Sequence, residues 1–299
     1  MQLASKGEAG FARHYTVLFG ERWPELRQAL VATSPKVLRV NGFASEAARL
    51  RDTRELTPLP RLPGCFRLES ASERVTLGLD EHELLSAYVM DAASVVAARA
   101  LQVRPGETVL DLCAAPGGKA LVLLEALASA GNLTLNDRSR KRSARLKTVL
   151  RQYVPANVLD RVKLTAHDAR RWGLYQPAAY DAILLDAPCS SERHVLGDPA
   201  ELAKWSPSRI QRLASDQYAM LAAAATALKP GGRLVYSTCA LAPQENDGVI
   251  ERLLKRARHA VEVSPVSAPL GEASEYGWQI HPDRHGAGPI YFCKLTKAA

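Results

Sequence analysis

The pattern of apolar and polar positions is most regular in the second two thirds of the chain. From Glu107 onward, short apolar runs alternate with longer segments in which apolar residues recur at helical spacing. The runs predict strands at 107–112, 132–136, 161–165, 180–186 and 233–238. The segments between them predict helices at about 118–130, 139–153, 207–228 and 244–258. Strands separated by helices are typical of βαβ units, which build a parallel sheet.

Several of the predicted strands are continuously apolar, such as YDAILLD at 180–186. This pattern indicates strands that are covered on both faces. The ending GPIYFCKL at 288–295 predicts one more strand without a following helix. We therefore predict an α/β fold with a doubly wound, mostly parallel, Rossmann-like sheet, helices on both of its faces and a small N-terminal α+β extension.

The N-terminal part has a different pattern and ends at a break in composition. Three prolines and a glycine in LTPLPRLPG at 56–64 interrupt any helix there. Before the break, the spacing predicts helices at 21–32 and 45–51 and a short strand at 37–40. A piece of this size has a thin core, so we expect it to lean on the rest of the chain. We divide the chain into an extension, 1–75, and a main domain, 76–299.

Composition and charge narrow the class of protein. With 47% hydrophobic and 23% charged residues the chain has ordinary globular composition, and its net charge of +8 favours polyanionic partners. The N-terminus has no signal-peptide core and no transit-peptide composition, and the longest apolar stretch, 218–228, is too short to cross a membrane. We expect a cytoplasmic protein that is monomeric and has no membrane partner.

The cysteines and histidines give no sign of a metal site or a disulfide framework. The five cysteines are odd in number, widely spaced and lack a C-x-x-C pair; they are Cys65, Cys113, Cys189, Cys239 and Cys293. His281 and His285 are four residues apart, but no further ligands cluster near them in the sequence. We expect no bound metal ion.

A loop rich in small residues follows the first strand of the main domain. It reads DLCAAPGGK at 111–119 and does not have the G-x-G-x-x-G spacing of a dinucleotide site. Pro116 also lacks an amide hydrogen where a pyrophosphate would need donors. The small residues still allow a ligand to approach the backbone; they are Ala114, Ala115, Gly117 and Gly118.

Two aspartates at the next strand ends suit a nucleoside. Asp137 lies about 20 residues past the glycines, where an acidic residue binds ribose hydroxyls. Asp168 follows the third strand and could contact an adenine amino group. A nucleoside without a pyrophosphate, such as S-adenosylmethionine, therefore fits better than a nicotinamide cofactor. The alternative is a glycine-rich turn whose aspartates only cap helices.

Two cysteines end neighbouring strands. Cys189 follows Asp186 in DAPCSS, and Cys239 ends YSTC. A single cysteine is usually a small buried apolar residue, as we expect of Cys65 and Cys293, while Cys113 is expected to pack behind the loop. Two thiols at the ligand-binding edge of a sheet, beside a carboxyl group, instead indicate covalent chemistry on a pyrimidine. A thiolate that adds to carbon 6 makes carbon 5 nucleophilic, and a second thiol can assist release.

The ordered set of motifs resembles the Nop/Sun (RsmB-like, Fmu) family of RNA 5-methylcytosine methyltransferases. The similarity rests on LDLCAAPGGK, NDRSRKR, HDAR, DAPCS and KPGGRLVYSTCAL…QEN, which span most of 105–250. Three segments are most similar to the branch with mitochondrial ribosomal-RNA members: Phe11–Leu30 with its GERWPELR, AYVMDAAS (87–94) and GPIYFCKL. The resemblance implies a class I methyltransferase sheet in 76–299, a role in RNA binding for 1–75 and cytosine-C5 methylation of RNA. The expected substrate is ribosomal RNA, with transfer RNA as the alternative.

The resemblance also implies roles for individual residues. Cys239 is the expected nucleophile, Cys189 assists product release, and Asp186 lies between cofactor and target base. S-adenosylmethionine would be bound by the loop, by Asp137 on the ribose with Arg142 in support, by Asp168 on the adenine, and by Asp186; the loop residues are Cys113, Ala114, Ala115, Pro116, Gly117, Gly118 and Lys119. The segment after the Pro-Cys motif, SERHVL at 191–196, departs from many members.

Basic residues predict where RNA binds. Seven of them lie between 138 and 151, with Arg138, Arg142 and Arg145 near one helical face. A second cluster at 204–212 lies near Trp205 and Tyr218, which we expect to offer stacking surfaces.

Three alternative functions stay open: methylation of a protein or small molecule, a non-catalytic RNA-binding assembly factor, and a nicotinamide dehydrogenase. The paired thiols disfavour the first, the intact set of cysteines and aspartates the second, and Pro116 the third.

Overall fold

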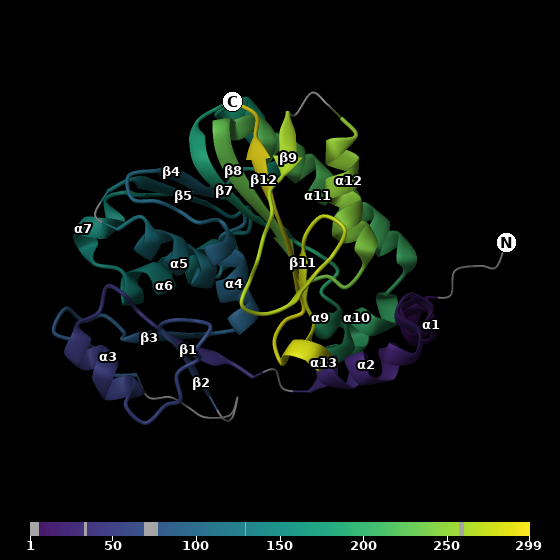
Figure 1. Cartoon of the computed structure of the whole chain (residues 1–299), viewed down its shortest axis with the longest axis horizontal. Coiled ribbons are helices and arrows are strands. Elements are labelled where there is room, and N and C mark those ends of the chain that lie inside the picture. Colours follow the sequence, from purple (N-terminus) through teal and green to yellow (C-terminus); the bar gives the residue numbers. More distant parts are fainter. Residues whose placement is uncertain (1–5, 33–34, 69–76, 129, 257–259) are drawn as a thin grey trace.

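The main body of the protein is a mixed sheet with helices on both faces (Figure 1). The computed structural model describes residues 6–32, 35–68, 77–128, 130–256 and 260–299. The sheet has the order β10-β11-β12-β8-β7-β4-β5-β6, and β9 pairs with β12. Its parallel strands are β4 (Thr108–Asp111), β5 (Asn132–Asn136), β6 (Val162–Thr165), β7 (Tyr180–Asp186) and β8 (Leu228–Thr238). Antiparallel strands extend it; they are β9 (Val261–Val263), β10 (Glu272–Ala273), β11 (Trp278–Ile280) and β12 (Ile290–Lys297).

The strands predicted for the main domain are present, and so is the doubly wound α/β fold. One strand differs, because β8 begins at Leu228 rather than at Arg233. Tyr180 pairs with Leu228 and Ala182 with Arg233, so residues 229–232 form a bulge opposite a single residue of β7. Gly231 has φ +70° in this bulge, a conformation that glycine adopts readily.

Helices cover the sheet in two layers because successive strand side chains point to opposite faces. Val109, Ala182 and Leu184 pack toward one layer, whereas Leu110, Ile183 and Leu185 pack toward the other. The first layer contains α4 (Ala92–Ala100), α5 (Gly118–Ala126) and α6 (Arg140–Tyr153). The second contains α8 (Trp172–Tyr175), α11 (Pro207–Ala227) and α12 (Asp247–Leu254). Two buried faces explain the continuously apolar strands.

Short elements connect this framework. The predicted helix at 244–258 begins only at Asp247, after the 3-10 turn η3 (Pro243–Glu245), and its predicted end falls outside the described residues. The remaining elements of the main domain are α7 (Ala156–Leu159), η2 (Ala169–Arg171), α9 (Glu192–Gly197), α10 (Pro199–Lys204) and α13 (Pro282–His285).

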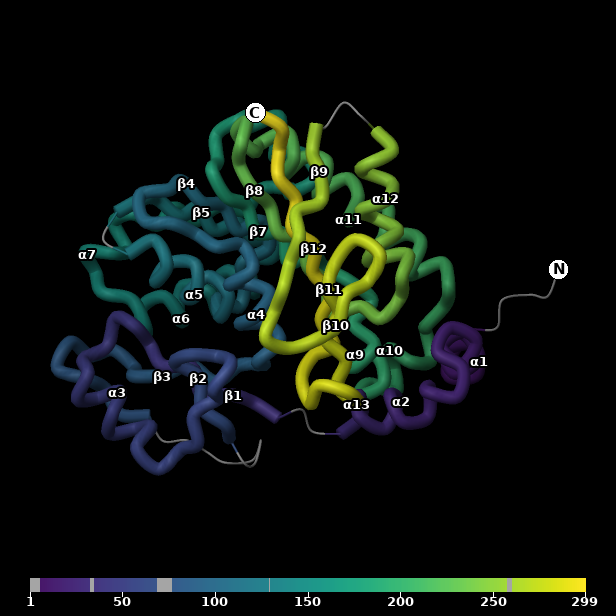
Figure 2. The backbone as a smooth tube through the Cα atoms, viewed as in Figure 1, coloured from purple at the N-terminus to yellow at the C-terminus, as the bar shows by residue number. Residues whose placement is uncertain are grey.

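The N-terminal part contacts the main body at two separate places (Figure 2). Its helices are α1 (Gly7–Phe19), α2 (Trp23–Val31), with η1 (Gly20–Arg22) between them, and α3 (Glu46–Thr53). Its strands β1 (Val37–Val40) and β2 (Cys65–Arg67) form a small antiparallel sheet with β3 (Ala87–Met90). The predicted boundary between 75 and 76 lies outside the described residues, and β3 follows it in the chain.

The first contact is an aromatic cluster beneath α9 and α10. Phe11 and Tyr15 of α1 pack with Trp23 of α2 and with Trp205, whose ring lies 5.4 Å from that of Phe11. Trp205 is fully buried there. The prediction that Trp205 and Tyr218 offer stacking surfaces is therefore wrong, because Tyr218 is also buried and Arg252 lies over its ring at 4.0 Å.

The second contact joins the small sheet to α5 and α6 through buried polar groups. Arg39, which is 2% exposed, forms an ion pair with Glu125 of α5 at 2.6 Å. Asn41 donates from Nδ2 to the carbonyl oxygens of Leu85 and Tyr153, at 2.8 and 2.9 Å. These bonds fix the sheet against the helical layer that carries the loop at 111–119.

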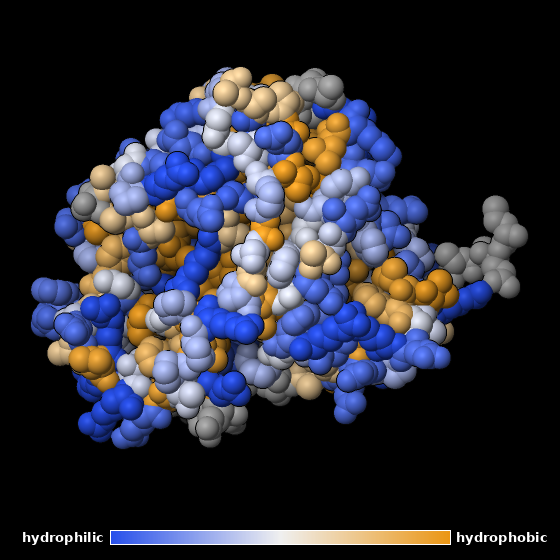
Figure 3. Space-filling model, viewed as in Figure 1, coloured by the Kyte–Doolittle hydropathy of each residue, from blue (hydrophilic) through white to orange (hydrophobic). Residues whose placement is uncertain are grey.

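The surface seen in Figure 3 is largely hydrophilic, with scattered apolar residues. Within the described ranges, every helix is too short or too polar to span a bilayer.

We expect Arg39→Ala to lower the free energy of unfolding by about 2–3 kcal/mol, because it leaves the Glu125 carboxylate without its charged donor. Guanidinium denaturation measures this change. The control is Arg54→Ala, which removes an exposed pair with Glu55 at 3.6 Å and should leave stability unchanged. Equal effects of the two substitutions would contradict the importance of this contact.

Candidate active site

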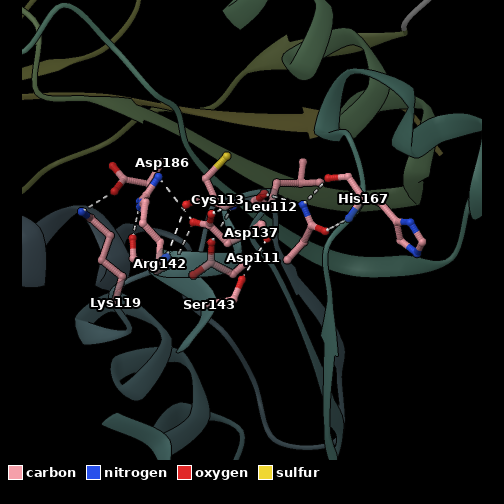
Figure 4. Close-up of polar contacts among 12 residues, drawn as sticks. Asp111, Leu112, Cys113, Lys119, Asp137, Arg142, Ser143, His167 and Asp186 are labelled. Atoms are coloured by element: carbon pink, nitrogen blue, oxygen red, sulfur yellow. Dashed lines mark hydrogen bonds and ion pairs between the residues drawn. The ribbon is translucent and has the colours of Figure 1, made fainter. Parts of the chain in front are cut away.

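The predicted functional residues come together at the carboxyl edge of the parallel sheet. Asp111 ends β4, Asp137 follows β5, and Asp168 follows β6. Asp186 ends β7, and Cys189 and Cys239 lie in the loops after β7 and β8. Figure 4 shows part of this edge, with Lys119 pointing toward Asp186 and Arg142 toward Asp137.

The loop at 111–119 is held by the end of β5 and the start of α6. Ala114 donates its backbone N–H to the Asn136 carbonyl at 2.8 Å, and Ala115 donates to the Asp137 carboxylate at 3.3 Å. The Arg142 guanidinium lies 3.4 Å from the same carboxylate and also donates to the Ala115 carbonyl. Arg142 thus supports both the loop and Asp137, which is the position predicted for it.

Close protein contacts require the two glycines of the loop. Gly117 has φ +122°, and a Cβ there would lie 3.0 Å from the Val149 side chain of α6. A Cβ on Gly118 would lie 2.9 Å from the Tyr88 ring of β3. The glycines were predicted to let a ligand approach; the structure shows that they also let α6 and β3 close on the loop.

Two cavities flank the loop and together suit a nucleoside with an amino-acid substituent. One, of about 330 Å³, is lined by Cys113, Asp137, Arg142 and Asp168, with Met220 among its apolar lining residues. The other, of about 270 Å³, is lined by loop residues 113–119, by Asp111 and Asp186, and by Tyr88 and Met90 of β3. The carboxylates of the first can accept from hydroxyl and amino groups. The residues present therefore fit S-adenosylmethionine.

Asp168 already has a partner in this cavity. Its carboxylate accepts from the Arg170 guanidinium at 2.8 Å, and this hydrogen bond lowers the pKa of Asp168. Arg138 lies 3.7 Å from the same carboxylate. The aspartate is thus held as an ionised acceptor at the edge of the cavity.

Asp186 lies between the loop and the thiols and contacts residues on both sides. Lys119 forms an ion pair with it at 2.7 Å, and Ser237 of β8 donates to its other oxygen at 2.8 Å. Burial lowers the pKa of Lys119, but the charge of Asp186, its hydrogen bond and the charges of Cys239 and Asp111 together raise it more, so the net shift is upward. Asp111 lies behind this pair, and burial, with the charge of Asp186, raises its pKa to about 7.

The two predicted thiols face each other with their sulfur atoms 3.0 Å apart. Both line a cavity of about 600 Å³, together with Asp186 and Lys119. The hydrogen bond from Cys189 lowers the pKa of Cys239 despite burial, and the Ser191 hydroxyl lowers it further. The same bond and burial raise the pKa of Cys189. Of the two thiols, Cys239 therefore loses its proton more readily.

The other cysteines have no such setting. Cys65 and Cys293 are buried, as expected. Cys113 is partly exposed and lines both cavities beside the loop, rather than lying behind it, and burial raises its pKa.

Sequence reasoning missed Ser191, Ser237 and two buried glutamates behind the thiols, Glu192 and Glu245. Glu245 lies in the QEN motif that contributed to the resemblance, but its spacing from Cys239 gave no chemical signal. Glu192 lies in the segment that departs from many family members. Both act on residues far away in the sequence, which a linear pattern does not reveal.

Solved structures share this fold. The chain is similar to a methyltransferase homologue from Pyrococcus horikoshii, with a TM-score of 0.76 and 26% identity, over 96% of this chain and 94% of that one. The NSun6 protein of the same organism, solved with SFG, has a TM-score of 0.77 at 21% identity and shares the fold over 96% of this chain and 97% of that one. The fold and site define a Rossmann-like methyltransferase, as predicted.

Sequence comparison narrows this class to a family. The profile described as 16S rRNA methyltransferase RsmB/F matches residues 98–296. The 5-cytosine rRNA methyltransferase NSUN4 of Bos taurus is 34% identical over 96% of this chain and 87% of its own. The mitochondrial tRNA (cytosine(34)-C(5))-methyltransferase of Mus musculus is 31% identical over 96% of this chain and 89% of its own. The chain belongs to the RsmB/F family, and the predicted Nop/Sun membership is confirmed.

Glu245 predicts a pH-dependent stability. Burial raises its pKa from 4.5 to about 7, so the folded state keeps a proton that the unfolded state releases above pH 4.5. The folded protein therefore loses stability as the pH rises from about 4.5 to about 7, by up to about 3 kcal/mol. We expect Glu245→Gln to abolish this loss in denaturation curves at pH 5 and pH 8. Parallel pH dependences of the wild type and the variant would contradict the assignment.

Proposed function

We propose that the protein transfers a methyl group from S-adenosylmethionine to carbon 5 of cytosine in ribosomal RNA through a covalent bond to Cys239. The class of reaction, RNA cytosine-5 methylation, follows from membership of the family. The observation that carries the catalytic roles is the pair of thiols 3.0 Å apart in a cavity that Asp186 also lines. Methylation of nitrogen or oxygen needs no such pair.

The site for the methyl donor, S-adenosylmethionine, is formed by the loop at 113–119 and by aspartates whose carboxylates can accept hydrogen bonds from it. Asp137 would hold the ribose, Asp168 the adenine, and the loop at 113–119 the amino-acid part. When bound, S-adenosylmethionine supplies an electrophilic methyl group on a sulfonium. The Lys119–Asp186 ion pair separates this part of the site from the thiol cavity and lines both.

Cys239 begins the reaction on the base. Its thiolate adds to carbon 6 of cytosine, and the ring electrons make carbon 5 nucleophilic. As carbon 6 bonds to sulfur, the ring nitrogen takes up a proton from solvent. The Asp186 carboxylate, which lines the same cavity and is oriented by Lys119 and Ser237, is placed to accept a hydrogen bond from that protonated nitrogen.

Cys189 acts at the end of the reaction. Once carbon 5 carries the methyl group, its proton must leave and the bond from carbon 6 to Cys239 must break. Water in the cavity takes the carbon 5 proton, and the electrons of that bond expel the Cys239 sulfur. Cys189 faces this sulfur and can donate its own proton to it as it leaves.

RNA binding is best explained by the exposed basic face of α6. Arg138 and Arg142 pair with aspartates of the donor site. Five further basic residues of this segment are exposed and have no acidic partner among the described residues; they are Arg140, Lys141, Arg145, Lys147 and Arg151. Unpaired cations on the helix whose Arg142 lines the thiol cavity suit the phosphates that flank a base turned out of the RNA chain.

Transfer RNA is the second candidate substrate, because one relative carries that name. The RNA-binding role of 1–75, the monomeric state and the cytoplasmic location stay predictions. The direct test of function is bisulfite sequencing of cellular RNA with and without the protein. A cytosine in ribosomal RNA that loses its protection supports the proposal, and one in transfer RNA supports the alternative.

Substitution of each thiol separates the two roles. We expect Cys239→Ala to abolish methylation without a covalent RNA complex, because the nucleophile is lost. Cys189→Ala should accumulate that complex, because methylation proceeds and release does not. Denaturing gel electrophoresis of the enzyme with RNA and S-adenosylmethionine shows both outcomes. The opposite pattern would mean that the roles are reversed.

The basic face predicts a salt effect. Arg145→Ala should weaken RNA binding and reduce the slope of log K against log salt by about 0.7–0.9, the contribution of one phosphate contact. The matched control is Lys255→Ala, directly after α12, which removes an exposed cation paired with Glu251. Identical slopes for the wild type and Arg145→Ala, measured by fluorescence anisotropy, would place the RNA elsewhere.

A further inference from the structure

The loops that carry the two thiols are joined by two buried glutamates, one from each loop. Glu192 follows the loop of Cys189 and accepts the backbone N–H of Leu241, in the loop of Cys239, at 2.9 Å. Glu245 belongs to the loop of Cys239 and accepts the backbone N–H of Ser190, next to Cys189, at 3.0 Å. Each loop thus binds the other through its own glutamate. Both carboxylates are fully buried.

Side chains from the sheet and from α11 hold the two glutamate-bound loops in place. Gln217 donates from Nε2 to the Pro188 carbonyl at 2.9 Å and to the Glu245 carboxylate at 2.8 Å. The Tyr236 hydroxyl of β8 donates to the Glu245 carbonyl at 2.6 Å. The backbone around each cysteine therefore has little freedom to move away from the other.

One donor comes from the N-terminal helix α1. The Tyr15 hydroxyl donates to Glu192 Oε1 at 2.5 Å, although the two residues are 177 positions apart in the chain. The Ser190 hydroxyl donates to the same oxygen. Tyr15 is fully buried in the aromatic cluster with Phe11 and Trp205, so its hydroxyl is held in place.

Hydrogen bonds alone stabilise this pair of carboxylates. Among the described residues, neither Glu192 nor Glu245 has a lysine or arginine partner. A buried carboxylate that loses a hydrogen-bond donor can find a new one only if the surrounding segments move. Here the surroundings are the two thiol loops, and a shift of about 1 Å is enough to disturb a reacting pair.

We propose that Tyr15 and Glu192 are positioning residues that set the contact between Cys189 and Cys239, so that α1 forms part of the catalytic apparatus. This inference rests on the proposed roles of the two thiols. It assigns to the extension a function in the reaction itself, in addition to any contact with RNA.

The test compares two tyrosines that each lose one buried hydroxyl. Tyr15→Phe removes the bond to Glu192, whereas Tyr180→Phe, the control, removes a bond to Gln176 at the far end of β7. We expect Tyr15→Phe to slow single-turnover methyl transfer about tenfold, with an unchanged KM for RNA. The pH of half-maximal alkylation of Cys239 by iodoacetamide should rise, because the thiolate loses its bond from Cys189. The control should leave both values unchanged.

A second variant, Glu192→Gln, keeps the side-chain volume and should shift both values in the same direction as Tyr15→Phe. If Tyr15→Phe lowers the melting temperature but leaves the methyl-transfer rate and the alkylation profile as in the wild type, the positioning role is wrong. Alkylation reports on the thiols independently of RNA. If the Cys189→Ala variant forms no RNA adduct while Tyr15→Phe still shifts the alkylation profile, the positioning role is supported and the proposed function is contradicted.

Discussion

The parallel pairing of β7 with β8 is the constraint on which the site depends. In this register Asp186 lies beside Ser237, so the two strands end level with each other and their loops begin at the same height. Cys189 is three residues past the end-paired Asp186, and Cys239 is two past Ser237. A shift of the register by one residue would turn the side chains of one strand to the opposite face and separate the sulfurs. Extensive apolar packing on both faces of the sheet holds the register.

Polar groups at this edge act in pairs, and each pair links two segments. Lys119 and Asp186 link the loop at 111–119 to β7. Arg142 and Asp137 link α6 to the end of β5, where Asp137 also holds the loop through the Ala115 N–H. A charge at the edge therefore has a partner before any ligand arrives, which reduces the reorganisation that binding requires. Asp111 and Glu245 form no ion pair among the described residues, and burial raises the pKa of each to about 7.

Much of the fold and the site could be predicted from the sequence, because both depend on local signals. Continuous apolar runs predicted the buried strands. The positions of Asp137, Asp186 and Cys239 at strand ends predicted that they lie at one edge of the sheet, which the structure shows. The exposure of Trp205 and Tyr218 could not be predicted, since it depends on α1, α2 and α12, which approach from other parts of the chain. Glu192 was missed for the same reason: its partners are at positions 15 and 241. The role of Arg142 followed from the family resemblance, and the structure places its guanidinium against Asp137 and Ala115.

The contact of β3 with the donor loop also bears on how this architecture can vary. Tyr88 and Met90 line the same cavity as residues 113–119, and Gly118 has no room for a methyl group beside the Tyr88 ring. The small sheet is thus not a separable module that recombination could replace freely. In a chimaera that took the small sheet from a distant homologue, the side chains of β3 would not fit the loop at 113–119. The cavity for the methyl donor would then be altered even if both parent proteins were active.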